Sequence, residues 1–168
     1  NADGSKVGVE FLVNTETSSF QYHPSVAMDA DGDFVVSWSS TGQDGSDYGI
    51  YAQRYNADGS TVGTEFLVNT YIIGRQSESG VVMDADGGVV VRWGSAGQDG
   101  DSYGVYAQRY SADGSNVGDE FLVNSFTASR QGASSVAMDA DGDFVVSWSS
   151  SGQDGSEGGV YAQRFSGA

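Results

Sequence analysis

The chain has 168 residues, of which 38% are hydrophobic and 12% aromatic, so it is too apolar for a disordered acidic chain and we expect a packed core. Its formal net charge of −16 opposes contact with phosphate backbones and anionic lipids, and we therefore expect no nucleic-acid partner and no membrane-surface binding. The absence of cysteine excludes disulfides, thiolate catalysis and cysteine-ligated zinc, and no apolar run approaches the ~20 residues of a membrane-inserted helix.

Four short motifs recur in the chain at a constant spacing of 55 residues, with no insertion or deletion. They are Glu-Phe-Leu-Val-Asn from Glu10, Met-Asp-Ala-Asp-Gly from Met28, Gly-Gln-Asp-Gly from Gly42 and Tyr-Ala-Gln-Arg from Tyr51, each present three times. Self-similarity at a fixed period is the signature of a repeat architecture. We predict one repeat domain over residues 1–168, with units at about 1–55, 56–110 and 111–165.

Each unit reads as four β-strands, taken here in chain order from the first complete copy. A short strand is predicted over 25–28, and after an Asp-Gly turn a second strand over 34–39 alternates apolar and polar positions. A glycine-rich loop over 41–49 leads to a third strand over 50–55. A second Asp-Gly turn precedes a fourth strand over 65–69. The fold class is therefore all-β, with each unit a four-stranded antiparallel meander.

The third and fourth strands carry apolar residues on both faces, with Tyr51 opposing Ile50 and Phe66 opposing Leu67. Such a sheet must be covered on both sides, as the stacked blades of a β-propeller are. The chain starts near a fourth strand and stops after a third, so we expect the N- and C-terminal strands to pair and close the ring. Three units are few for a propeller, which predicts a homodimer or another homo-oligomer. A three-fold β-prism or β-trefoil-like monomer is the alternative.

The segments Asp29–Trp38, Gly42–Gly45, Ile50–Tyr55 and Glu10–Asn14, with their copies, resemble a known tandem repeat. It is the VYAQRY/GQDG-type repeat of large bacterial secreted or surface proteins, which also contains a DxDGxFVVxW hairpin. The resemblance covers nearly the whole chain. It implies a propeller-like or adhesive module located outside the cell or at the cell surface. That family has no agreed catalytic residue set, so the resemblance transfers none.

Two acidic turns are candidate calcium sites. Their carboxylates are spaced i, i+2 and i+4, which can let oxygen ligands converge on Ca²⁺; the residues are Asp29, Asp31 and Asp33 in the first unit and Asp139, Asp141 and Asp143 in the third. The pattern resembles the DxDGDG loops of integrin-type propellers, but Phe34 and Phe144 replace a glycine and no final Asp follows. A hairpin turn alone also explains Asp and Gly here. Calcium is the only cofactor for which the sequence offers candidate ligands.

The Gln-Asp-Gly loops and the links between units are candidate ligand-binding segments. In a propeller both sets lie on one face, and amides, carboxylates and aromatic rings together suit hydroxyl-rich ligands such as glycans. The candidates are Gln43, Asp44, Tyr48, Gln98, Asp99, Tyr103, Gln153 and Asp154 in the loops and Gln21, Gln76 and Gln131 in the links. The alternative is that these Asp and Gln side chains bond their own loop backbone.

Catalysis finds little support, because the chain has one histidine, His23, and no G-x-S-x-G motif. We predict a non-enzymatic, lectin-like extracellular module that binds glycans. A structural or self-assembling repeat scaffold, natural or engineered, is the alternative, and a carbohydrate hydrolase with a spatially paired carboxylate set is the third. We expect Trp38, Trp93 and Trp148 in the core. Arg92, which replaces the serine of the other units, marks an asymmetric contact.

Overall fold

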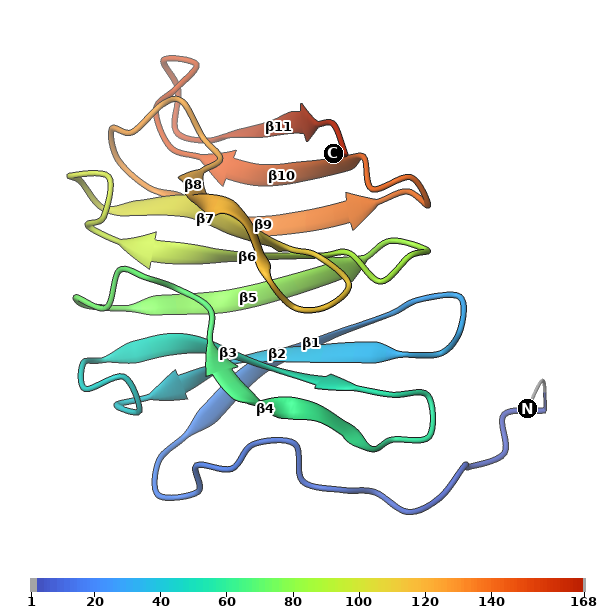
Figure 1. Cartoon of the computed structure of the whole chain (residues 1–168). Coiled ribbons are helices and arrows are strands. Elements are labelled where there is room, and N and C mark those ends of the chain that lie inside the picture. The colour runs from blue at the N-terminus through green and yellow to red at the C-terminus, as the bar shows by residue number, and fades with distance from the viewer. Residues whose placement is uncertain (1–2, 168) are drawn as a thin grey trace.

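The structure is a computed structural model that describes residues 3–167, and it contains eleven antiparallel strands in three sheets (Figure 1). Residues 1, 2 and 168, which the predicted repeat domain includes, lie outside the described part. Within that part, no helix is long and apolar enough to cross a membrane.

Each sheet is a meander in which consecutive strands pair. The first sheet contains β1 (Gln21–Met28), β2 (Phe34–Thr41), β3 (Tyr48–Tyr55) and β4 (Thr61–Leu67). The second contains β5 (Gln76–Met83), β6 (Val89–Ala96), β7 (Tyr103–Tyr110) and β8 (Asn116–Leu122). The third contains β9 (Gln131–Met138), β10 (Phe144–Ser150) and β11 (Gly159–Phe165). It has three strands, because the N-terminal segment that was expected to supply its fourth strand does not pair with it.

The Asp-Gly hairpins form for a local reason that the sequence contains. The Asp29 carboxylate accepts hydrogen bonds from the backbone N–H groups of Asp31 and Asp33, both at 3.0 Å. Gly32 takes a φ of 92°, which a residue with a Cβ rarely adopts. The same carboxylate pattern recurs at Asp84 and Asp139, so each β-hairpin at this end of the sheets is held by its own first aspartate.

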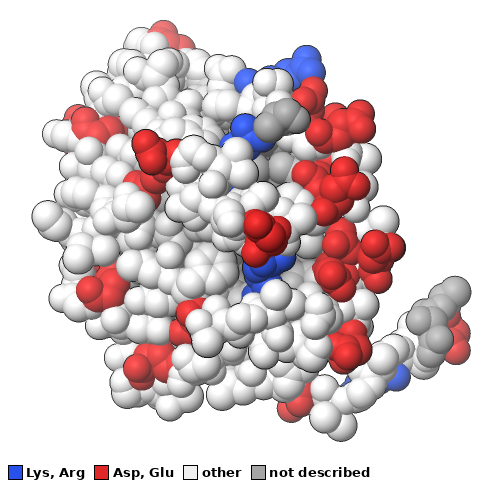
Figure 2. Space-filling model, viewed as in Figure 1, with Lys and Arg blue, Asp and Glu red and all other residues white. Residues whose placement is uncertain are grey.

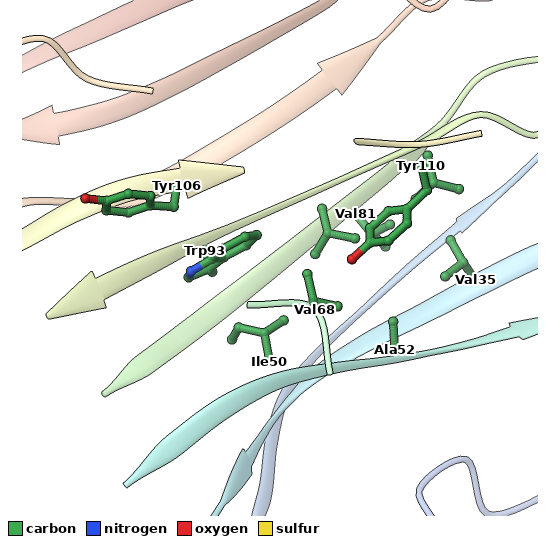
Figure 3. Close-up of a cluster of buried hydrophobic side chains, with 10 residues drawn as sticks. Val35, Ile50, Ala52, Val68, Val81, Trp93, Tyr106 and Tyr110 are labelled. Carbon is green, nitrogen blue, oxygen red and sulfur yellow. The ribbon is translucent and has the colours of Figure 1, made fainter. Parts of the chain in front are cut away.

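The three sheets stack face to face, and the core lies between them (Figures 1 and 3). Ile50 and Ala52 of β3 and Trp93 of β6 are completely buried between the first two sheets. Val105 of β7 is equally buried against the third sheet, where Trp148 lies. The strands of the second sheet are therefore covered on both faces, as their two-sided apolar pattern predicted. All three tryptophans are buried.

The N-terminal segment differs from the prediction. Residues 10–14 form no strand, and they run along the first sheet at one end of the stack, whereas β11 lies at the other end (Figure 1). The two ends that were expected to pair are separated by the thickness of three sheets. The expected closure of the ring therefore does not occur within the described chain.

Candidate functional site

The Gln-Asp-Gly loops and the links between sheets lie at the same end of the strands, opposite the Asp-Gly hairpins (Figure 1). Backbone hydrogen bonds join each link to the end of the following second strand, from Thr41 N–H to Phe20, from Ala96 N–H to Arg75 and from Ser151 N–H to Arg130. Isolated parallel bridges also join Tyr48 to Arg75 and Tyr103 to Arg130. Each link is thus fixed to the end of the second strand that follows it, and the second and third links are also fixed to the end of the Gln-Asp-Gly loop of the preceding sheet.

The Gln-Asp-Gly side chains mostly bond within the protein. The side-chain amides of Gln43 and Gln98 donate to Glu65 and Glu120, on the fourth strands of their own sheets. The Asp44 carboxylate accepts from the Ser46 N–H at 3.0 Å, as Asp99 and Asp154 do two residues further on in their loops. The side chains that were predicted to bind a ligand therefore stabilise the loops themselves. Few of their polar atoms remain free for a ligand.

Gln153 differs from its two counterparts. No fourth strand follows β11 in the described chain, and within residues 3–167 the Gln153 side chain has no hydrogen-bond partner. Its carbonyl oxygen is nevertheless buried. The third loop is therefore an incomplete version of the first two.

The glutamines of the links correct the sequence prediction most clearly. Gln76 and Gln131 are completely buried, and their amides donate to the carbonyls of Ile73 at 3.1 Å and Ala128 at 2.8 Å. Gln21 is half-buried and donates to the Ser19 carbonyl at 3.4 Å. The side-chain N–H groups of these glutamines brace the link backbone, while their buried Oε1 atoms have no hydrogen-bond partner among residues 3–167. Gln76 and Gln131 are therefore structural and not free to bind a ligand, whereas Gln21 remains partly exposed.

The tyrosines of the loops are both covered by arginines. The Arg75 guanidinium lies over the Tyr48 ring at 4.4 Å from its centroid, and Arg130 lies over Tyr103 at 5.0 Å. Sequence reasoning missed both arginines, although they occupy the same position in consecutive links. Cation–π stacking fixes each guanidinium while leaving its edge N–H groups able to donate.

A strip of aromatic rings is present at the first link only. The Phe20 ring stacks on Tyr22 with centroids 5.5 Å apart, and Tyr22 lies 6.0 Å from Tyr48. Phe20 is 67% exposed, which is unusual for a phenylalanine that has a packing partner. We call Phe20, Tyr22 and Tyr48 the aromatic strip. The sequence signal for this strip was the aromatic content of the first link. At the positions of Phe20 and Tyr22 the later units carry Arg and either Ser or Gly.

A cavity of about 190 Å³ adjoins the second link. Its walls include Arg75, Ser77, Glu78, Tyr103 and Arg130, and the Arg130 guanidinium lies 4.0 Å from the Glu78 carboxylate. A second pocket of about 320 Å³ shares Glu78 and is also lined by His23, Pro24, Ser79, Arg92 and Ser134. We refer to the aromatic strip and these two pockets together as the inner-strand surface, because β1, β5 and β9 contribute most of it.

The backbone of the inner strands is strained beside this surface. His23, Glu78 and Ala133 occupy equivalent positions in the three units, and each has a positive φ, of 50°, 61° and 47°. Each lies where the register between the first and second strands shifts. Non-glycine residues in this conformation cost of order 1–3 kcal/mol and concentrate at functional sites. Bulges of this kind re-aim side chains, here those of His23 and Glu78.

Arg92 is the cation most deeply placed in the inner-strand surface. Its guanidinium donates to the Glu78 carbonyl, and burial lowers its pKa, an effect that the Glu78 carboxylate opposes. Gly80 faces Arg92 across β5 and β6, whereas the other units pair Ser25 with Ser37 and Ser135 with Ser147. A side-chain carbon at Gly80 would lie 2.5 Å from Arg92 Nε, so the serine found at this position in the other units does not fit beside the arginine as it is placed here.

Burial also shifts the pKa of two tyrosines near the loops. Desolvation raises the pKa of Tyr51 to about 12, with smaller contributions from the carboxylates of Asp44 and Glu65. Tyr106, its counterpart in the second sheet, is raised to about 12 for the same reasons. Both phenols stay neutral at physiological pH, so they act as buried packing groups and not as bases.

The carboxylates of the acidic turns mostly bond the backbone of the protein. Among residues 3–167, no three His, Cys, Asp or Glu side chains are grouped so that they could hold a metal ion. Asp33 accepts from the Ala57 N–H at 2.8 Å and Asp143 from the Gly167 N–H at 2.6 Å, which ties each turn to the chain after the third strand. Asp31 and Asp141 are exposed. The carboxylates thus face backbone amides, and Figure 2 shows acidic groups along the edge of the molecule.

The sequence matches no family model and no curated protein. The structure is similar to the crystal structure of an endo-arabinase from Bacteroides thetaiotaomicron, with a TM-score of 0.58. The two chains are 16% identical over 90% of this chain and 58% of the other, so this chain spans less than two thirds of that structure's length. The similarity shows a shared all-β arrangement of stacked antiparallel sheets.

Proposed function

We propose that the chain is a non-enzymatic, extracellular glycan-binding module whose ligand lies on the inner-strand surface. The observation that carries this proposal is the exposed aromatic strip beside a cavity with two guanidinium groups. Sugar rings present apolar C–H faces that pack on aromatic rings, while their hydroxyls need fixed donors and acceptors. Arg75, Glu78 and Arg130 supply such groups within one cavity.

The ligand we infer is a glycan that includes a carboxylate-bearing sugar. Arg75 and Arg130 are two of only seven basic residues in a chain of net charge −16, and both line the same cavity. Guanidinium groups held by stacking match carboxylates through paired N–H donors. The overall negative charge repels an anion at long range, so the attraction acts at short range within the cavity.

Binding without hydrolysis is the reading that the cavity chemistry supports. The endo-arabinase is a glycoside hydrolase by its name, but at 16% identity the similarity shows only a related fold. Glycoside hydrolysis generally uses a pair of carboxyl groups that flank the bond to be cleaved. The described linings of the two pockets contain a single carboxylate, Glu78. This favours a binding module over a hydrolase.

The frame on which we place this function is propeller-like, with each sheet acting as one blade. The similarity to part of the endo-arabinase structure and the resemblance to secreted bacterial repeats both support this proposal. Variable links on a constant sheet frame are the usual location of recognition residues. The aromatic strip belongs to one link only, so we expect one principal binding site per chain.

Calorimetric titration with neutral and uronic-acid oligosaccharides tests the proposal. We expect binding that weakens at least tenfold in Tyr22→Ala and in Arg130→Ala, with the larger loss for acidic sugars in Arg130→Ala. Asp119→Ala is the control, because Asp119 is exposed on β8 and lies outside the inner-strand surface. A folded wild-type chain that binds no neutral or acidic sugar would refute the proposal.

A further inference from the structure

The outer edge of β11 is an open strand edge. In the first two sheets the third strand pairs with a fourth, as Tyr51 does with Leu67 and Tyr106 with Leu122. Within residues 3–167, β11 pairs only with β10. Val160 of β11 is 83% exposed, whereas its counterparts Ile50 and Val105 are completely buried. An uncovered apolar edge of this kind is a template for pairing with another chain.

Residues 7–14 in the N-terminal segment correspond by the 55-residue spacing to a fourth strand. In the described chain no third strand lies beside them. Gly8 has a φ of 73°, close to the 69° of Gly63 in β4 and the 71° of Gly118 in β8. The Phe11 ring lies 5.4 Å from Tyr55, as Phe66 lies 5.5 Å from Tyr110 in the next sheet. The segment already has the backbone bend and the ring packing of a fourth strand, although no strand within residues 3–167 pairs with it.

Hydrogen bonds place this segment in the same way. The Thr15 N–H donates to Glu65 at 2.7 Å, and the equivalent Thr70 N–H donates to Glu120 at the same distance. In both cases the residue that follows a fourth-strand sequence is fixed to the next sheet. The segment is therefore held on the first sheet of its own chain with its other edge free.

The faces at the two ends of the stack are complementary as well. On the first sheet, Val26 and Met28 are 63% and 61% exposed, while the equivalent Val81 and Met83 pack into the core between sheets. On the third sheet, Val145 is 36% exposed, while the equivalent Val35 and Val90 are almost completely buried. Each open face thus carries one side of the sheet-to-sheet packing that the chain forms between its first and second sheets and again between its second and third sheets.

We propose that a second copy of this chain covers both open features, so that two copies form a closed dimer of six sheets. In each half, residues 7–14 of one copy pair with β11 of the other, and the first sheet of one packs on the third sheet of the other. The 55-residue spacing then fixes the register, with Leu12 opposite Tyr161, Phe11 opposite Ala162 and Val7 opposite Arg164.

Three polar contacts follow from the same register. Asn69 and Asn124 accept from the N–H groups of Ile50 and Val105 at 2.6 and 2.7 Å, so Asn14 of one copy accepts from Val160 N–H of the other. The Val13 N–H donates to the Val160 carbonyl, as Val68 does to Ile50. Glu10 accepts from the Gln153 amide, as Glu65 does from Gln43. The incomplete third loop gains its missing partner.

Charge sets the conditions under which this dimer forms. Each copy carries a net charge of −16, so the two copies repel one another at low ionic strength. The contacts themselves are strand hydrogen bonds and apolar packing, which salt does not screen. We therefore expect the dissociation constant to fall by about tenfold or more between ~10 and ~300 mM salt.

Sedimentation equilibrium of the 168-residue chain tests the proposal. We expect a mass of twice 17.5 kDa at 300 mM salt. Val160→Glu should shift the dissociation constant at least tenfold toward monomer, because it places a carboxylate on the paired edge. Ile73→Glu is the matched control, since Ile73 is 69% exposed on a link outside the proposed contact, and it should leave the mass unchanged. A monomer at millimolar concentration, or assembly beyond two copies, overturns the closed dimer.

Cysteine cross-linking tests the register independently, because the chain has no cysteine of its own. The double variant Phe11→Cys with Ala162→Cys should form two disulfides between copies on oxidation and run as a covalent dimer. Phe11→Cys with Val145→Cys, which are not opposite each other in this register, should not. Equal cross-linking of both pairs, or a disulfide within one chain in the first variant, would contradict the strand exchange.

Discussion

The ring of Phe11 lies 5.4 Å from that of Tyr55, although no strand pairs with the segment that carries Phe11. This contact matches the 5.5 Å pairs Phe66–Tyr110 and Phe121–Phe165 within the stack. The segment is positioned by packing on the face of the first sheet. Packing against the next sheet is therefore enough to position a fourth-strand sequence, even where no third strand pairs with it.

The first prediction concerns that packing. Phe11 is 54% exposed, so Phe11→Ala should lower the free energy of unfolding of the monomer by only about 1–2 kcal/mol, measured by urea denaturation at low salt. Phe66→Ala removes a more buried ring from the core between sheets and should cost about 3–4 kcal/mol. If the two losses were equal, the N-terminal segment would be held as firmly as β4.

The second prediction concerns Glu120, which joins three parts of the second sheet and its link. Its carboxylate accepts from the Gln98 amide and from the N–H and hydroxyl of Thr70. Glu120→Ala should therefore lower the free energy of unfolding by about 2 kcal/mol, since hydrogen bonds to charged groups contribute ~1.5–3 kcal/mol. Asp119→Ala, at the exposed neighbouring position, is the control and should change it by less than ~0.5 kcal/mol.

The third prediction concerns alkaline pH. Burial raises the pKa of Tyr51 and of Tyr106 to about 12, above the ordinary value of 10.0 in the unfolded chain. The folded state therefore binds more protons above pH 10, and the stabilisation present below that pH is lost as pH rises toward 12. Tyrosinate absorbance should show these two phenols titrating late. Burial also raises the pKa of Tyr55 and Tyr110, so Tyr51→Phe and Tyr106→Phe should each reduce the amplitude of the late component by one phenol and not abolish it. An unchanged amplitude would contradict the assignment.

The fourth prediction concerns calcium and the acidic turns. Asp29 and Asp139 already accept two backbone N–H groups each, and the described residues group no three possible ligands. We expect millimolar Ca²⁺ to raise the melting temperature by no more than about 2 °C, through weak screening of the acidic surface. Differential scanning calorimetry with Ca²⁺, with Mg²⁺ and with chelator measures this. A large rise specific to Ca²⁺ and reversed by chelator would restore the calcium site.

The fifth prediction concerns the pair formed by Gly80 and Arg92. Gly80→Ser alone should destabilise the fold by about 1–3 kcal/mol, because its side chain meets the Arg92 guanidinium. The double variant Gly80→Ser with Arg92→Ser recreates the Ser25–Ser37 pair of the first sheet and should recover most of that loss. Thermal unfolding of the four combinations gives the coupling energy. Additive effects would show that the two positions are not energetically coupled.

The sequence by itself determined the repeat, the antiparallel meander and the burial of Trp38, Trp93 and Trp148. These follow from local rules, since alternation along a strand and an aspartate beside its own turn act within a few residues. The strand ends were less accurate. β1 begins at Gln21 and not near residue 25, because the bulge beside His23 interrupts the alternation that marks a strand.

Only the tertiary structure decided which polar side chains are free. Gln76 looked like a ligand-binding residue and is buried against the Ile73 carbonyl, while Arg75, one position earlier, stacks on Tyr48 from the previous sheet. The aromatic strip and the open edge of β11 also depend on contacts between segments many residues apart. A fixed repeat spacing specifies what each unit can form, but the partner of each surface depends on how the units are placed in space.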